Sequence, residues 1–147
     1  MTTAGGLLRW QFRLVHGLLE GAVGRLPADA VHLRARYAQA VLCEDLTISA
    51  GLAGTTPLAL SSWAEWTGMS ELPPLAAHTD WAGWEGRVRV DLVAVRGYAQ
   101  AVYGVTDTFL AGLPEEALDP SRGEGPICLL SGLLVTLASR RGELARG

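Results

Sequence analysis

The chain has 147 residues, a formal net charge of -3, and 49% hydrophobic against 18% charged residues. This composition is typical of a soluble globular protein, and the length suits one domain with a core of its own over residues 1–147. The basic residues are all arginine and are spread along the chain. The basic stripe that neutralises phosphates is therefore missing, and no nucleic-acid partner is expected.

Neither a secretion signal nor a membrane span is expected. Residues 1–6 lack the charged and then apolar layout of a signal peptide. The longest apolar run, residues 127–138, is too short to cross a bilayer. Cys43 and Cys128 do not make a disulfide framework, so we expect reduced thiols and a cytoplasmic location.

The first expected helix covers residues 8–26, where apolar residues alternate four and three positions apart. This spacing is typical of a helix that faces a core. The stripe consists of Leu8, Phe12, Val15, Leu19, Ala22 and Leu26. Pro27 ends the helix, because the residue before a proline is pushed out of the helical region.

A second helix is expected from Asp29, whose carboxylate can cap it, to about Gly51 or Gly54. Its apolar face carries Ala35, Ala38, Leu42 and Leu46. Since the link at residues 27–29 is short, the first two helices are expected to be antiparallel neighbours. The connection that follows, residues 54–79, is long enough for helices two and three to run parallel.

Within that connection, Ser62 and Glu65 have the spacing of a capping box, which predicts a short helix through Trp63 and Trp66. Trp63 and Trp66, together with Trp81 and Trp84, are expected to seal one end of the fold rather than to stack on a ligand.

The third helix is expected after Asp80 as N-cap and before Pro114, with an apolar stripe of about seven turns from Val88 to Leu113. Its stripe is Val88, Leu92, Val95, Ala99, Val102, Thr106, Phe109 and Leu113. Pro126 suits the first position of a fourth helix. No segment alternates with period two, so the predicted class is all-α: a four-helix bundle with a long connection between helices two and three.

Several segments, taken in order, resemble the DinB-like superfamily of bacterial four-helix bundles. They are residues 10–12, 37–45, 80–81, 87–92 and 142–143. Members of that superfamily hold a divalent metal such as zinc or nickel with three histidines, and some are thiol-dependent transferases or a mycothiol-dependent isomerase. The resemblance places the three ligand positions at Gln39, Thr136 and Arg140, none of which is histidine here.

The residue types at these positions predict that the metal site is lost. Positions 136 and 140 lie one turn apart on a face with Leu129 and Leu133, so both side chains are expected to point inward. Glutamine and threonine are poor zinc or nickel ligands, and the Arg140 guanidinium has no lone pair. A dication about 4 Å from that charge meets roughly 8 kcal/mol of repulsion at an effective dielectric near 20. No cofactor is therefore expected.

Four other residues are candidates for a rearranged site or for pairing with Arg140. They are Cys43, Glu44, Asp45 and Glu143. One hypothesis is that Arg140 pairs with Asp45 or Glu44 across the core and fills the space of the metal. The alternative is that its guanidinium reaches solvent near the helix end.

The histidines and cysteines give weaker signals. His16, His32 and His78 lie on three segments without ligand spacing, and His16 lies off the main stripe, so each is expected to be a surface or partly buried residue. Cys43 is expected to be a small buried hydrophobe. Cys128, near a helix start, has a slightly more favourable place for a thiolate.

We therefore expect a non-catalytic binding or interaction module. The alternative is a metal-dependent, thiol-linked transferase or isomerase that uses a rearranged metal site. A purely structural docking subunit is a third reading, and the sequence leaves open whether the chain forms a homodimer.

Overall fold

The structure, a computed structural model, describes residues 3–73, 80–119 and 125–147. These residues form helices and connecting turns, which confirms the all-helical class. Within the described ranges the one β-type pairing is an isolated antiparallel bridge between Met69 and Val90. No helix among them is long and apolar enough to cross a membrane.

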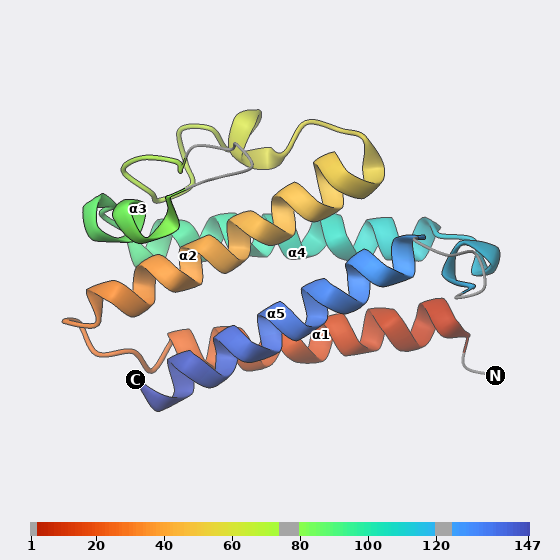
Figure 1. The fold of residues 1–147 in the computed structure, drawn as a ribbon, viewed down its shortest axis with the longest axis horizontal. Helices are drawn as coiled ribbons and strands as arrows, with labels where there is room; N and C mark the ends of the chain where they lie inside the picture. Colours follow the sequence, from red (N-terminus) through yellow and green to blue (C-terminus); the bar gives the residue numbers. More distant parts are fainter. Residues whose placement is uncertain (1–2, 74–79, 120–124) are drawn as a thin grey trace.

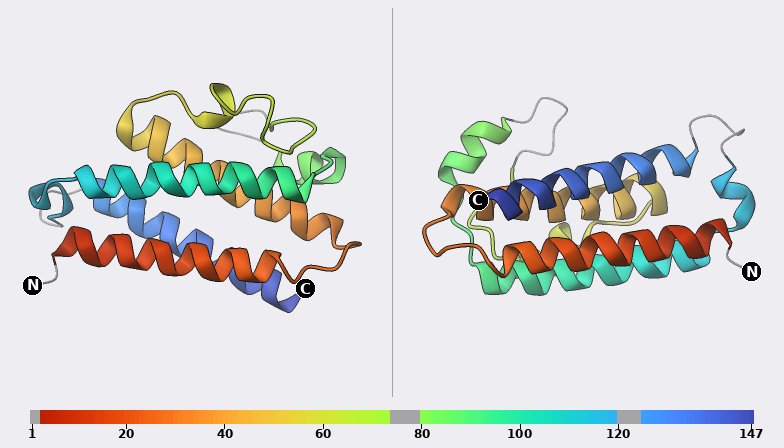
Figure 2. Two further views of the ribbon diagram at one scale, coloured as in Figure 1. Left: turned by 180° about the vertical axis from the view of Figure 1, so that it is seen from behind. Right: turned by 90° about the horizontal axis from the view of Figure 1, so that it is seen from below.

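Four long helices lie side by side (Figure 1). They are α1 (Ala4–Val23), α2 (Val31–Asp45), α4 (Leu92–Gly112) and α5 (Pro126–Arg146). Helices α2 and α4 run in one direction, and α1 and α5 run in the other (Figures 1 and 2). The expected parallel course on either side of the long connection is therefore present.

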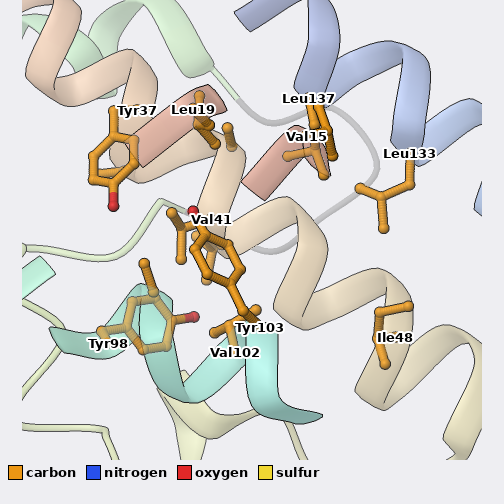
Figure 3. Packing of buried hydrophobic residues seen from close by; sticks show 14 of the residues in the cluster. Val15, Leu19, Tyr37, Val41, Ile48, Tyr98, Val102, Tyr103, Leu133 and Leu137 are labelled. Atoms are coloured by element: carbon orange, nitrogen blue, oxygen red, sulfur yellow. The ribbon is translucent and has the colours of Figure 1, made fainter. Parts of the chain in front are cut away.

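The first two helices are antiparallel, but they are not the close neighbours that the short link predicts. Each packs mainly on α4 and α5, so α1 and α2 face each other across the core. Side chains from all four helices meet there (Figure 3). Fully buried examples are Leu19, Val41, Val102 and Leu137.

Helix α1 starts earlier than the stripe predicts, because the Thr3 hydroxyl accepts a hydrogen bond from the Gly6 amide at 2.9 Å. Its buried surface is also wider than one stripe. His16 is buried beside Val15, and Val23 beside Ala22, because the helix packs on two partners. The wider buried surface of α1 therefore includes a polar side chain, that of His16.

Helix α2 begins at Val31 after Ala30, and Asp29 does not cap it. The helix continues without a break into a π-helix, η1 (Leu46–Ala53), which ends at Gly54 with φ 67°. The predicted end at Gly54 is therefore right, and its left-handed backbone explains why a glycine is suited to it.

The connection after Gly54 contains a short 3-10 helix, η2 (Leu58–Leu60), and then hydrogen-bonded turns over residues 61–66. The helix predicted from Ser62 and Glu65 is therefore wrong. The connection is instead held to the core by Asp45, whose carboxylate accepts hydrogen bonds from the amides of Leu58 and Ala59, both at 2.9 Å.

The predicted third helix is broken in two, α3 (Trp81–Arg87) and α4. Asp80 caps α3 as predicted, through the Gly83 amide at 2.9 Å. A second cap, Asp91, starts α4 through the Ala94 amide at 3.2 Å. Between them, Val88 is extended.

The break is stabilised from a distant part of the chain. The Asp91 amide donates to the Gly68 carbonyl at 2.8 Å. Gly68 has φ 81°, and a Cβ there would lie 2.5 Å from the Val95 nitrogen. Only glycine allows this close approach, so the break depends on tertiary pairing that a local pattern does not reveal.

The tryptophans seal the fold in part. Trp84 is fully buried, donates to the Glu71 carbonyl at 2.9 Å and meets Trp81 edge-on with centroids 5.7 Å apart. Trp63 is half-buried near Tyr98, whereas Trp66 is 66% exposed. The prediction therefore fits Trp81 and Trp84 and fails for Trp66.

After α4, a 3-10 turn, η3 (Glu115–Leu118), precedes α5. Helix α5 starts at Pro126, as predicted, and its buried row is Leu130, Leu133, Leu137 and Leu144.

Candidate functional site

The region between α2 and α5 brings into direct contact two of the three residues at which the resemblance predicts metal ligands, Gln39 and Arg140. Arg140 Nη2 donates to Gln39 Oε1 at 3.3 Å, and Arg140 Nη1 donates to Glu143 Oε2 at 2.7 Å. Arg36 Nε lies 3.0 Å from the same Glu143 oxygen. The Arg140 side chain is only 12% exposed, so a positive charge is held between α2 and α5 beside Gln39.

Thr136 does not join this contact. Its side chain is exposed, and its hydroxyl donates to the Gly132 carbonyl one turn earlier at 3.0 Å. The prediction that position 136 faces inward is therefore wrong, because the buried row of α5 follows Leu133 and Leu137.

The proposed pairing of Arg140 with Asp45 or Glu44 is also wrong. Arg140 uses the nearer carboxylate of Glu143. Burial opposes ionisation of Glu143, but the charges of Arg140 and Arg36 outweigh it and lower the pKa of this carboxyl. Asp45 and Glu44 accept hydrogen bonds from other groups, among them Tyr98 for Asp45 and Thr106 for Glu44.

Cys43 is half-buried rather than fully buried. Burial raises the pKa of its thiol, and the positive charge of Arg140 opposes that shift. Cys128 is exposed at the start of α5. In the described ranges, 3–73, 80–119 and 125–147, no group of three His, Cys, Asp or Glu residues is placed to hold a metal ion.

A second region, the α1–α4 cleft, has a volume of about 460 Å³. It is lined on α1 by Phe12, Arg13, His16, Gly17 and Glu20, and on α4 by Gln100, Tyr103, Gly104 and Asp107. Clefts of a few hundred cubic ångströms are the usual size for small-molecule sites.

The inner wall of the cleft contains a buried His–Glu pair. His16 Nε2 lies 2.8 Å from Glu44 Oε1, and Thr106 donates to Glu44 Oε2 at 2.6 Å. The imidazole stacks on Tyr103, with ring centroids 3.8 Å apart. His16 is only 8% exposed, so the prediction of a surface or partly buried residue is wrong.

One turn after His16, Glu20 joins three helices. Its Oε2 accepts hydrogen bonds from the hydroxyl groups of Tyr37 on α2 and of Tyr103 on α4, the latter at 2.9 Å. Its Oε1 accepts a hydrogen bond from Arg96 Nε at 3.1 Å. Burial raises the pKa of both tyrosines above the ordinary value, so each remains a hydrogen-bond donor.

The rim of the cleft carries an ion-pair cluster. Asp107 accepts hydrogen bonds from Arg9 at 2.8 Å and from Arg13 at 3.0 Å. These two guanidinium groups lower the pKa of Asp107 to about 2. Gly17 of α1 and Gly104 of α4 both line the cleft, and a Cβ at either position would meet nothing within 4 Å.

The remaining histidines contribute little. His32 is exposed and lies 3.3 Å from Glu85. His78 lies outside the described residues. Two features of the sequence point to the cleft. One is the pair His16 and Glu20, four residues apart on one helix. The other is the adjacent acidic pair Glu44 and Asp45 in an otherwise apolar stretch at the end of α2.

Comparison with known proteins adds no family. No family model, no curated protein and no solved structure matches the chain.

Proposed function

We propose that this chain is a DinB-like four-helix bundle that has lost the three-histidine metal site and acts as a non-catalytic binding module through the α1–α4 cleft. The ordered segments that resemble the superfamily support the bundle assignment, as does the ring of contacts among the four long helices.

The observation that carries the proposal is the contact between Arg140 and Gln39. A permanently charged guanidinium lies at 3.3 Å from the side chain that replaces a ligand. It cannot donate an electron pair, and it repels a dication. The neighbouring carboxylate of Glu143 is already paired with two arginines.

The enzymatic alternative requires a rearranged metal site made from Cys43, Glu44, Asp45 or Glu143. Glu44 and Asp45 are occupied by hydrogen bonds in the core. Burial favours the protonated thiol of Cys43, which is a poor metal ligand. These contacts favour the binding module.

Elemental analysis of the untagged protein, purified from cells supplied with zinc and nickel, tests the proposal. We expect no stoichiometric metal. A stoichiometric zinc or nickel ion that is lost on replacing Glu143 or Cys43 overturns the proposal in favour of the enzymatic alternative. Stoichiometric metal held elsewhere overturns it as well.

A further inference from the structure

The outer side of α1 carries a row of exposed apolar side chains. Its members follow one another three or four residues apart, so they share one face of the helix. They are between 43% and 59% exposed: Leu7, Trp10, Leu14 and Leu18. A contiguous apolar patch of this kind marks an interaction surface.

The charged side chains of α1 all turn towards α4 and away from this row. Arg9 and Arg13 bind Asp107 of α4. Glu20 accepts a hydrogen bond from Arg96 of α4. Residues 4–23 contain no other aspartate, glutamate, lysine or arginine, so no such charge interrupts the apolar row.

Helix α5 extends this apolar surface, because it packs along α1 (Figure 2). Its residues 126–139 include no charged residue. Arg140 reaches Gln39 of α2, and the helical repeat places three exposed residues on the other side of α5, beside α1: Ser131, Val135 and Ala138. We call the surface that these three form with the row of α1 the α1–α5 face.

One end of the α1–α5 face is basic. Arg25 reaches back over Gly21 at the end of α1, where its Nη1 lies 3.8 Å from the position of an added Cβ. Arg146 lies in the same way over Gly142 of α5, at 3.6 Å. Because α1 and α5 run in the same direction, both guanidinium groups are at one end of the face (Figures 1 and 2).

The other end of the face is acidic. Glu115 lies beside the start of α1, because its Oε1 accepts a hydrogen bond from the Gly5 amide at 3.3 Å. Glu116 follows it in the chain and is exposed. The two ends are about 30 Å apart, since α1 has 20 residues and a helix rises about 1.5 Å per residue.

A second copy of the chain fits this pattern. When the copy is turned end to end about a two-fold axis, apolar surface meets apolar surface and each basic end faces an acidic end. The face is about 30 Å long and two helices wide, on the order of 600 Å², which is close to the roughly 800 Å² that each partner buries in a stable interface. A membrane surface fits less well, because anionic lipid headgroups repel the acidic end.

We propose that this protein forms a homodimer in which the α1–α5 faces of two copies pack antiparallel. The large side chains of α1 in one copy pack on the small side chains of α5 in the other, and the two-fold axis repeats this contact. At each rim, Arg25 and Arg146 of one copy lie opposite Glu115 and Glu116 of the other. The inference concerns a surface other than the α1–α4 cleft and does not depend on the proposed binding function.

Sedimentation velocity of the full chain across the micromolar range tests the assembly. We expect a species of twice the 15.6 kDa mass of the chain. Leu14→Glu should be monomeric, because a dimer would bury the new carboxylate of each copy in an apolar interface. Since the Leu14 side chain is exposed, the variant should stay folded, which circular dichroism checks.

Val135→Glu makes the same test from α5, at a residue that is 66% exposed, and should also be monomeric. Val93→Glu is the matched control, because it places the same charge on an exposed valine of α4, outside the face, and should remain dimeric. A monomeric parent overturns the proposal, and one that binds anionic phosphatidylglycerol vesicles assigns the face to a membrane. A dimer that both face variants leave intact, or that Val93→Glu disrupts equally, overturns the placement.

Charge reversal tests the antiparallel order. Arg25→Glu and Glu116→Arg should each weaken the dimer several-fold, and the double variant should regain the parent's dissociation constant to within about twofold. The two residues lie at opposite ends of one chain, further apart than the screening length, so the rescue requires contact between copies. Net charge alone would move the two single variants in opposite directions. Weakening of both without rescue in the double variant overturns the antiparallel order.

Discussion

The α2–α5 region and the α1–α4 cleft differ in which groups pair with their carboxylates. In the first, Arg140 and Arg36 share one carboxylate, Glu143, near the surface. In the second, the carboxylate of Glu44 is fully buried and is held by the neutral or titratable donors of His16 and Thr106.

Because of this difference, the α2–α5 region should repel a cation, whereas the α1–α4 cleft offers space for a ligand. The arginines of the α2–α5 region place fixed positive charges there, so a metal cation is repelled. The cleft has a volume of about 460 Å³ and is lined by His16 and Glu20. Binding should therefore be sought at the cleft, and a metal should bind in the α2–α5 region only when Arg140 is removed.

The largest expected effect is the gain of a metal site in the α2–α5 region. The triple variant Gln39→His, Thr136→His and Arg140→His should bind zinc at micromolar affinity or better, on the order of 8 kcal/mol. Although the Thr136 side chain is exposed, histidines at 136 and 140 would lie one turn apart, a spacing that lets two imidazoles bind one ion, and Gln39 already contacts position 140. Zinc affinity is measured by competition with a chromogenic chelator.

The double variant Gln39→His and Thr136→His is the control, because it keeps the guanidinium of Arg140 and should bind no zinc. If the triple variant folds and takes up no zinc, the ligand positions given by the resemblance are wrong.

The next largest effect concerns the interior carboxylate Asp45. Asp45→Ala should lower the free energy of unfolding by roughly 4 kcal/mol, because it leaves several buried donors without their acceptor. These donors are the Tyr98 hydroxyl and the amides of Leu58 and Ala59. Urea denaturation measures the loss.

Glu143→Ala is the matched change in the other region, and it should cost about 1 to 2 kcal/mol, because Glu143 is partly exposed and the mostly buried Arg140 keeps its contact with Gln39. A cost for Asp45→Ala as small as that for Glu143→Ala contradicts the contrast between the interior and the surface.

Much of the helical layout could be predicted from local signals. Pro126 and Asp80 mark helix starts, and Gly54 marks an end, because each acts on its own turn of backbone. The break before α4 could not be predicted in this way. It depends on Gly68 approaching Asp91 from a distant segment, while the apolar stripe continues through the break.

The candidate site shows the same limit. The contact between Gln39 and Arg140 follows from placing both on facing helices, but Thr136 faces solvent because α5 buries a narrow row. The burial of His16 is not predicted by the stripe for the opposite reason. Helix α1 packs on two partners, so its buried arc is wider than a single stripe, and the partner Glu44 comes from another helix.

The smallest expected effect lies at the rim of the cleft. The pKa of Asp107 is lowered from 3.8 to about 2 by hydrogen bonds and charge from Arg9 and Arg13. A carboxyl with a depressed folded-state pKa stabilises the protein above its unfolded pKa, and this contribution is lost as the pH falls through the folded value. Asp107→Asn should therefore lower stability at neutral pH by less than about 1 kcal/mol, since the group is partly exposed.

The difference between the parent and Asp107→Asn should shrink as the pH falls from 3.8 to about 2, and added salt should reduce it at neutral pH. Thermal unfolding across this range measures both trends. Asp29→Asn serves as the control, because Asp29 is exposed and forms no ion pair with the residues that the structure describes. A constant difference for Asp107→Asn at every pH indicates that the arginines stabilise the rim through packing of their side chains and not through the charge of Asp107.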